Sequence, residues 1–409
     1  METLHERCSG LDVHKDTVVA CVRIASGRTA HREVRSFSTT TSGLLKLHDW
    51  LQESGVTHVA MEATGIYWKP VWHLLESSFE LVLANASHIK AVPGRKTDMN
   101  DATWIADLVA HGLIRASFVP PTPIQELRDL TRLRKQVVQE KNRHVQRIQK
   151  VLQDANLKVD SYVSDLLGKS GRAVLDALVE GHTSPDVLVS LTTGRLKASK
   201  DELREAFRGR VTRHHRFLLQ LHLRQIDQID RSIEELEAQA RQAIEPFRHH
   251  VEQLTAMPGI SVTTAHVILA EIGSDMSVFP SASHLLSWAG MCPRSDESAG
   301  KRRSTRLRHG APWLKSTLVQ AAWSAARKKD SYFRALFGRL KSRRGAKKAI
   351  VAVAASMLST AYHLLRDGTA YQDLGPLYFD QLHRDRTAKN LVRRLQTLGF
   401  DVNLKTVAT

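Results

Sequence analysis

The sequence predicts an α/β domain followed by a mainly helical region. Up to residue 119, short apolar runs typical of strands alternate with helical patterns. Pro120, Pro121 and Pro123 then interrupt the chain, and the patterns beyond them are almost entirely helical. With 409 residues and 42% hydrophobic content, the chain is long enough for two or three globular domains.

The first 119 residues show the order of elements expected for a mixed sheet. A strand begins at Leu11. Two more strands, at residues 17–24 and 33–38, follow it and are joined by short hairpin turns. A helix over residues 44–51, a strand over 59–61 that ends on Glu62, a helix over 67–75 and a strand over 81–83 come next. This order is compatible with a five-stranded mixed sheet covered by helices.

Two long helices are predicted in the second part of the chain. The first spans residues 124–152, where Arg134, Lys141 and His144 interrupt a clean heptad pattern. The second spans residues 217–244, with apolar residues near heptad a and d positions. His222 is the exception to this apolar pattern. The pattern predicts a coiled-coil pair, either within one chain or across a dimer. Residues 155–200 are expected to form short helices.

A Pro258-Gly259 turn separates two further predicted helices. Gly259 permits a backbone conformation that exposes N–H groups, and the next helix begins close by, which suits a phosphate. The pattern is that of a helix-hairpin-helix, which holds nucleic-acid backbone, although a Pro-Gly turn is also a common helix connector. The predicted domains are residues 1–120, 121–248 as a helical coiled-coil linker, 249–375 and a tail at 376–409. Apolar helices are also expected over 313–326 and 349–365.

Charge is distributed unevenly along the chain. The net charge is +17. Residues 301–348 contain sixteen Lys and Arg against Asp330, the one acid, whereas residues 1–115 contain twelve against thirteen acids. A block of one sign predicts contact with a polyanion such as nucleic acid. The residues expected to bind nucleic acid are Gly259, Lys301, Arg302, Arg303, Arg306, Arg308 and Lys315.

Composition also indicates the cellular compartment in which the protein is expected. Cys8, Cys21 and Cys292 are too few and too scattered for a disulfide framework or a zinc site, which suits a reducing cytoplasm. The sequence contains no run of about eighteen apolar residues, so no membrane span is expected. Its first residues are polar, so no signal peptide is expected either.

Four carboxylates are candidates for a metal site. Asp98 and Asp101 lie three residues apart at the start of a predicted helix and share one face. They could instead be an N-cap and a first-turn acid. Asp12 and Glu62 lie on predicted strands, and in a ribonuclease-H-like sheet these positions would converge with a late helix. Four such groups would bind Mg²⁺, as a pair of ions. Other acids, Asp16, Glu33 and Asp107, are expected to face solvent.

Several motifs together resemble the DEDD transposases of the bacterial insertion sequence 110 family. They span nearly the whole chain in the family's order, at residues 10–15, 61–68, 96–102, 258–260, 289–293 and 297–301. The resemblance implies a RuvC-like catalytic domain, a coiled-coil linker and a C-terminal transposase domain. It also implies recombination through a covalent serine–DNA intermediate, with a bridge RNA that selects donor and target DNA.

The resemblance assigns roles to individual residues. Asp12, Glu62, Asp98 and Asp101 match the acidic quartet that binds Mg²⁺, and Ser298 matches the nucleophile. This chain reads Ser-Ala-Gly where the family has Ser-Gly, so Ser295 is an alternative nucleophile.

Three functions are compatible with the sequence. The first is a recombinase of a mobile element, active as a homodimer or tetramer on duplex DNA and associated with the bacterial nucleoid. The second is an invertase that acts on one fixed locus. The third is a nucleic-acid-binding protein without catalysis, in which the carboxylates are helix caps and solvent-facing charges.

Overall fold

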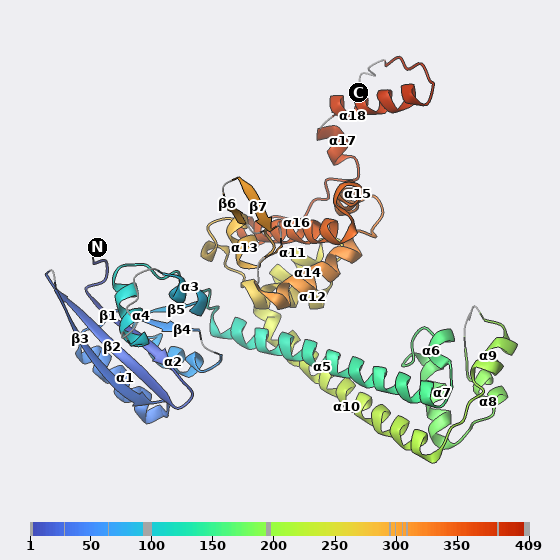
Figure 1. Cartoon of the computed structure of the whole chain (residues 1–409), viewed down its shortest axis with the longest axis horizontal. Coiled ribbons are helices and arrows are strands. Elements are labelled where there is room, and N and C mark those ends of the chain that lie inside the picture. The colour runs from blue at the N-terminus through green and yellow to red at the C-terminus, as the bar shows by residue number, and fades with distance from the viewer. Residues whose placement is uncertain are drawn as a thin grey trace. The chain divides into compact units, whose positions relative to one another are not determined.

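The computed structural model describes residues 3–27, 29–63, 65–92, 100–193, 198–293, 296–298, 300–304, 306–307, 310–382 and 384–404. The chain divides into two compact units, Met1–Val119 and Pro120–Thr409 (Figure 1). The division falls among the prolines that interrupt the sequence pattern. Each unit is described by itself below.

The first unit contains a mixed sheet in the order β3-β2-β1-β4-β5. Its strands are β1 (Arg7–Val13), β2 (Thr17–Ser26), β3 (Thr29–Ser38), β4 (His58–Glu62) and β5 (Glu80–Ala84). Strand β2 pairs antiparallel with β1 and β3, while β4 pairs parallel with β1 and β5. The five-stranded mixed sheet predicted from the sequence is therefore confirmed.

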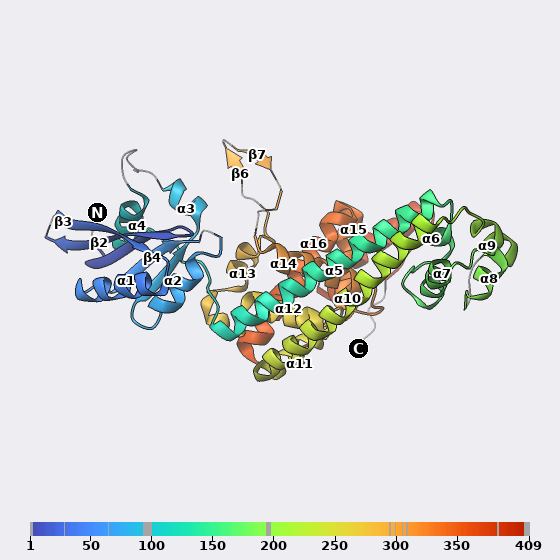
Figure 2. The same ribbon diagram turned by 90° about the horizontal axis from the view of Figure 1, so that it is seen from below.

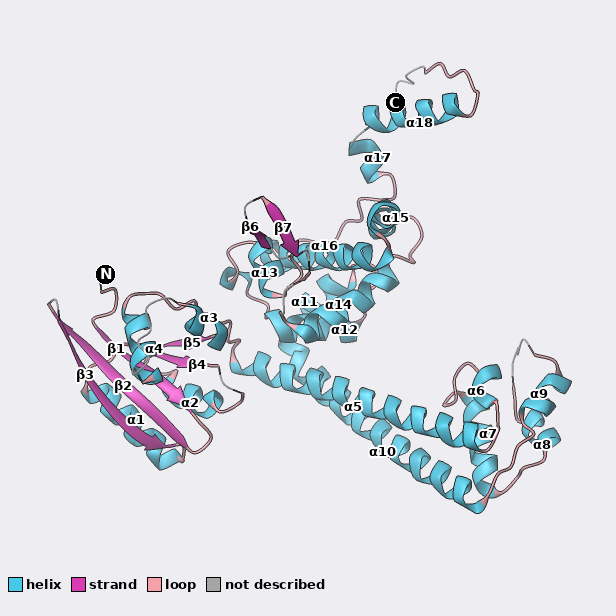
Figure 3. Ribbon diagram, viewed as in Figure 1, coloured by secondary structure: helices cyan, strands magenta, loops and turns pink. Residues whose placement is uncertain are grey.

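Helices cover both faces of this sheet, as the ribbon in Figure 3 shows. They are α1 (Thr41–Glu53), α2 (Trp68–Leu75), α3 (Ala86–Ala91) and α4 (Asp101–Ala110). Leu11 and Met61 pack in one core with Leu47 of α1, while Cys8 and Ala60 pack in another with Ile105 of α4. Alternate residues of β1 and β4 thus face opposite layers, as the two-residue period of a strand requires.

Two long helices, α5 (Thr122–Asp154) and α10 (Arg213–Ile244), run side by side in the second unit (Figures 1 and 2). At their far end lie the short helices α6 (Val159–Tyr162), α7 (Lys169–Glu180), α8 (Pro185–Ser190) and α9 (Lys200–Ala206). Leu152, Leu178 and Leu219 belong to the core that joins these elements. The long helices therefore pair within one chain, and the predicted short helices are present.

Polar pairs span the middle of the α5–α10 contact. Arg134 lies 2.6 Å from Glu237, and Lys141 contacts Asp230. The Nδ1 atoms of His144 and His222 are 3.3 Å apart. The residues that interrupt the heptad pattern thus contact the opposite helix through polar groups.

The histidine pair predicts a pH-dependent stability. Burial lowers the pKa of His144 and of His222, and Arg147 lowers both further. The unfolded chain therefore takes up protons more readily below about pH 6.5, the ordinary histidine value. We expect the contribution of this pair to be complete above that pH and to be lost as the pH falls toward the lowered pKa values. Thermal melting of wild type and His222→Gln from pH 8 to pH 5 measures it. The difference between the two curves should change with pH, and a constant difference would contradict the expectation.

Apart from one small hairpin, the remainder of the second unit is helical and packs around α16 (Ala346–Asp367). It comprises η1 (Glu245–Phe247), α11 (Arg248–Thr255), α12 (Val262–Ile272), η2 (Met276–Val278), α13 (Ala282–Trp288), α14 (Pro312–Ala325), α15 (Tyr332–Arg344), α16 (Ala346–Asp367), α17 (Tyr378–Leu382) and α18 (Arg384–Thr397). Among the described residues, α16 is the one helix long and apolar enough to cross a membrane. Val353, Met357 and Leu358 on α16 are fully buried, however, so its apolar face belongs to the protein core.

A buried ion pair fixes α5 to α12. The carboxylate of Glu271, only 1% exposed, accepts two hydrogen bonds from Arg132, at 2.7 and 2.8 Å. Arg128 donates to the backbone oxygens of Ala270 and Glu271, both at 2.9 Å. Charged groups at this depth are tolerated because each is paired in good geometry.

Candidate functional site

Helix α4 runs antiparallel to the start of the chain and strand β1. The N–H groups of Leu4 and His5 donate to the oxygen of Ala110, at 2.8 and 3.1 Å. Further along β1, a Cβ added to Gly10 would lie 2.3 Å from the backbone oxygen of Ala102 and from the nitrogen of Ala106. Glycine is therefore required where the helix backbone lies against the strand. As β1 advances toward its C-terminal end, the contacts move toward the N-terminal end of α4.

This packing brings three of the predicted acids to one edge of the sheet. Leu11 pairs with Met61 in the parallel register of β1 and β4, so the next residues, Asp12 and Glu62, are neighbours at the strand ends. Asp12 lies two residues beyond Gly10 and thus on the α4 side of the sheet. Asp101 is the first residue of α4, at the end of the helix that β1 approaches. A strand pair and a late helix therefore meet at this edge, whereas the gathering of the acids into one metal site stays a prediction.

The beginning of α4 differs from one prediction. Asn100 is the N-cap, and its side-chain oxygen accepts a hydrogen bond from the N–H of Ala102 at 2.9 Å. The N-cap role considered for Asp98 therefore belongs to Asn100. Asp101 is exposed in the first turn, where its charge suits the helix dipole. Asp98, like the rest of residues 93–99, lies outside the described residues.

Asp12 has a neighbour that sequence reasoning missed. Its Oδ2 atom is 3.2 Å from Nε2 of His14, whose side chain is 60% exposed. His14 follows Asp12 by two residues, which is the period that places strand side chains on one face. That spacing was the available signal. His14 is thus a polar neighbour of the Asp12 carboxylate.

Asp107 was expected to face solvent, and that expectation was wrong. Its Oδ1 atom lies 3.0 Å from Nε of Arg23 and 2.9 Å from Nη2 of Arg32, and its side chain is 14% exposed. These pairs connect α4 to strands β2 and β3. Asp107 therefore stabilises the fold through its ion pairs and is not one of the acids at the sheet edge.

The three acids fit a hard divalent cation by their donor chemistry. Asp12, Glu62 and Asp101 offer carboxylate oxygens, the ligands that Mg²⁺ prefers in proteins. Like charges at one edge raise the free energy of the fold unless a cation compensates them. Across the part of the chain that the structure describes, no three His, Cys, Asp or Glu side chains gather closely enough to hold a metal. The predicted fourth ligand, Asp98, lies outside that part.

Ser298 lies on a small hairpin in the second unit. Its strands are β6 (Asp296–Ser298) and β7 (Lys301–Ser304), and Ser298 pairs with Lys301. Gly300 adopts a φ of 74°, the left-handed conformation that a tight turn needs. Ser298 therefore lies on a strand next to a tight turn. Ser295 lies outside the described residues, and so does the side chain of Ser298.

The predicted nucleic-acid residues have different surroundings. Lys301 and Arg306 are exposed, and Lys315 lies half-buried on α14. Arg302 and Arg303 are on β7, with side chains outside the described part of the chain, as is all of Arg308.

Gly259 is explained by packing. Its φ is +83°, and an added Cβ would lie 2.4 Å from the backbone oxygen of Ala321 on α14. Met257 and Ile260 on either side are almost fully buried. The helix–turn–helix order around Gly259 is present, and this packing favours its interpretation as a helix connector. Phosphate binding at Gly259 stays a prediction.

Comparisons with known proteins bear on both units. A transposase family model for the DEDD domain of IS110 elements matches residues 9–157, and a second, described as "Transposase IS116/IS110/IS902 family", matches residues 251–338. The chain is 34% identical over 125 residues to the "Insertion element IS110 uncharacterized 43.6 kDa protein" of Streptomyces coelicolor, an alignment that covers 30% of each chain. It is 24% identical over 378 residues to the "Pilin gene-inverting protein" of Moraxella bovis, covering 88% of this chain and 96% of that one.

The two family models match in the order that the sequence motifs predict. The first contains the edge with Asp12, Glu62 and Asp101, and the second contains the hairpin with Ser298. Their combined match covers more than half of the 409 residues. The chain therefore belongs to the IS110 family of transposases.

Proposed function

We propose that this protein cuts and rejoins DNA as the transposase of an insertion element, through a phosphoserine intermediate. The observation that carries the proposal is the position of Asp12 and Glu62 at neighbouring strand ends and of Asp101 at the start of α4, in a chain that matches both transposase family models. The carboxylates would hold Mg²⁺ together with Asp98. A metal held there would neutralise charge on the phosphodiester and on the departing oxygen.

The serine supplies the covalent step in this proposal. The Ser298 oxygen attacks a DNA phosphorus, an O–P bond forms, and a bond from phosphorus to a deoxyribose oxygen breaks. The serine proton must pass to a base or to water, because a neutral hydroxyl is a poor nucleophile. The cations of β7, beginning at Lys301, would stabilise the charge on the attacked phosphate. Attack by a deoxyribose hydroxyl then reverses the step and rejoins the strand without an external energy source.

We further propose the partners that the family resemblance implies. They are donor and target duplex DNA, a bridge RNA that selects them, and a second or further copies of the chain. The bacterial cytoplasm, at the nucleoid, is where these partners meet. Sequencing the RNA and DNA that copurify with the protein tests this set. Recovery of one structured RNA with element ends would support it, and random fragments alone would oppose it.

A second candidate function rests on the Moraxella relative. That protein is named as gene-inverting, and the alignment covers nearly all of it. An invertase would use the same chemistry on two sites within one DNA molecule. A plasmid carrying paired sites in inverted order distinguishes the functions, since inversion changes only the orientation of the intervening segment while transposition moves the element to a new site.

Binding to DNA should depend on the basic hairpin. We expect Arg302→Glu, Arg303→Glu and Arg306→Glu, made together, to weaken duplex binding regardless of sequence. For each phosphate that is no longer neutralised, the slope of log affinity against log salt should flatten by about 0.9, since fewer counterions are released. A binding titration at several salt concentrations measures this slope.

The helical arm, α5 and α10, offers a second surface with which to compare the hairpin variant. Among the cations of the arm, Arg132, Arg134 and Lys141 pair with acids, and Lys135 contacts Ser316. Arg143 and Arg147 are exposed instead. Reversing these two should leave the slope close to that of wild type. If they flatten it and the hairpin variants do not, the footprint lies on the arm.

A further inference from the structure

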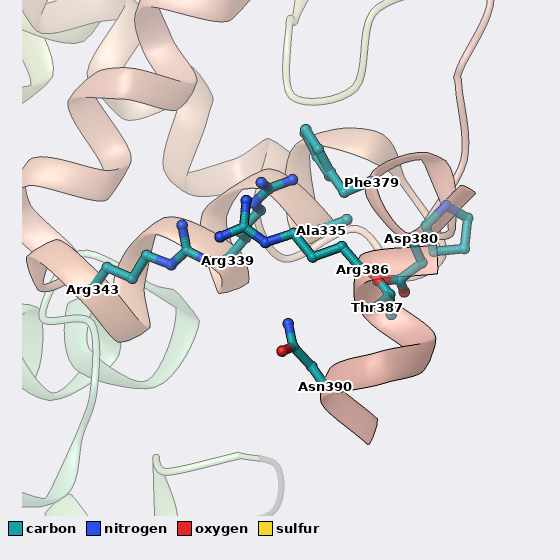
Figure 4. A pocket seen from close by; sticks show the side chains of 9 residues that line it. Ala335, Arg339, Arg343, Phe379, Asp380, Arg386, Thr387 and Asn390 are labelled. Carbon is teal, nitrogen blue, oxygen red and sulfur yellow. The ribbon is translucent and has the colours of Figure 1, made fainter. Parts of the chain in front are cut away.

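A basic pocket lies between α15 and the two C-terminal helices, away from the Ser298 hairpin in the sequence. Its volume is about 390 Å³. Figure 4 shows three arginine side chains extending into the same space, Arg339 and Arg343 from α15 and Arg386 from α18, with Asn390 across from them. The pocket thus combines guanidinium and amide donors from helices that are about forty residues apart in the sequence.

One of these arginines is held in place by aromatic rings. The guanidinium carbon of Arg339 lies 4.9 Å from the ring centre of Phe379 on α17. On Phe379 in turn stacks Tyr332, with ring centres 5.2 Å apart. A stacked guanidinium keeps its N–H groups available at its edge, and it loses little freedom when it binds an anion. The stack therefore prepares Arg339 to hold a phosphate.

The charges around the pocket are unbalanced. Asp380 is the one carboxylate among its described lining residues, against three arginines. Within the described residues, none of the three arginines forms an ion pair with a carboxylate. Arg339 and Arg343 are four residues apart on one helix, a spacing at which like charges destabilise the helix. An anion in the pocket would remove this repulsion.

The aromatic stack also indicates the kind of nucleic acid. Proteins that bind single strands offer free aromatic faces on which bases stack. Here Arg339 and Tyr332 each stack on the Phe379 ring. The pocket therefore suits a backbone phosphate and not a stacked base. A duplex presents its phosphates on the outside and keeps its bases stacked inside. Lys389, Arg393 and Arg394 on α18 are exposed and extend the positive charge beyond the pocket.

We propose that this pocket binds a backbone phosphate of duplex DNA, so that α15, α17 and α18 form a second DNA contact surface in addition to the hairpin. The proposal rests on the proposed function, because the duplex is the substrate of recombination. It assigns a role to the segment 376–409, which the sequence had suggested was only a tail.

The test compares two charge-matched variants of the full-length protein. The first is Arg343→Gln with Arg386→Gln, which removes two pocket cations. The control is Lys200→Gln with Arg210→Gln, two exposed cations at the far end of the helical arm. Binding to a DNA duplex of fixed length is measured across a salt series, in parallel with an RNA hairpin of matched length and a single strand. We expect the pocket variant to bind the duplex more weakly, with a salt slope flatter by about 0.9 for each phosphate that the pocket no longer neutralises.

Several outcomes decide between the alternatives. Unchanged duplex binding and slope in the pocket variant, with the control also unchanged, overturn the proposal. A loss confined to the RNA hairpin or to the single strand also overturns it, because the surface then serves another partner. Arg343→Lys with Arg386→Lys should restore the slope if phosphate charge is what matters. Recombination by the wild-type protein is scored separately, so the pocket assignment can fail while the proposed function stands.

Discussion

Asp12→Asn should reduce recombination by roughly a thousandfold or more while the protein stays folded, because loss of one well-placed electrostatic interaction costs about 10²–10³ in rate and a metal ligand is removed as well. The same result is expected for Glu62→Gln, Asp98→Asn and Asp101→Asn. Without metal, each variant should melt at or slightly above the wild-type temperature, since one of several neighbouring like charges is removed.

Magnesium should separate these variants from the wild type. A ligand that binds only the folded state stabilises it by about 2.7 kcal/mol at a concentration of 100 Kd. We therefore expect Mg²⁺ to raise the melting temperature of the wild-type protein and to raise that of the variants less. Thermal melting with and without Mg²⁺, beside a recombination assay, measures both effects.

Two neighbouring residues provide matched controls. Asn100 caps α4, so Asn100→Ala should lower stability by about 1 kcal/mol with or without metal. Asp107 pairs with Arg23 and Arg32, so Asp107→Asn should lower stability but keep the wild-type response to Mg²⁺. If Asp101→Asn behaves like Asn100→Ala, the Asp101 carboxylate stabilises the helix. The interpretation of the acids as helix caps and surface charges is then correct.

Ser298→Ala should abolish recombination while duplex binding stays within about twofold of wild type. The substitution removes the attacking oxygen but no cation, and phosphate contacts dominate affinity for DNA. Simple hydrolysis would leave nicked ends, whereas serine attack conserves the phosphodiester energy in a phosphoserine link, from which the strand can be rejoined. The variant should therefore yield neither joined products nor nicks.

Ser295→Ala is the control for this position. It should recombine at nearly the wild-type rate if Ser298 is the nucleophile. Recombination by Ser298→Ala together with its loss in Ser295→Ala would move the nucleophile three residues toward the N-terminus and leave the family assignment intact.

Local patterns in the sequence predicted the architecture of the first unit well. Apolar alternation marked the strands, and the placement of Asp12 and Glu62 at strand ends followed from them. The same reasoning missed Gly10, because the close approach of α4 depends on a helix about ninety residues further along the chain. It also assigned Asp107 to solvent, since its partners Arg23 and Arg32 are 84 and 75 residues away.

The second unit shows where sequence periodicity was insufficient. The heptad pattern identified α10. The role of the polar residues of α5 could not be predicted, because it depends on partners on the other helix, such as Asp230 for Lys141. The hairpin of β6 and β7 was missed because its strands are short and strongly polar, with no apolar alternation to mark them. The basic pocket depends on α15 and α18 being close, which the charge pattern alone does not reveal.

The central claim is that Ser298 becomes linked to DNA in a reaction that needs the acids at the sheet edge. Its most direct test is to incubate the protein with substrate DNA and Mg²⁺, denature it in hot detergent, and map any protein–DNA adduct by mass spectrometry of the digested peptide. The account predicts an adduct on Ser298 in the wild-type protein and none in Asp12→Asn. An adduct on another residue, or strand joining with no adduct formed at any time, would contradict it.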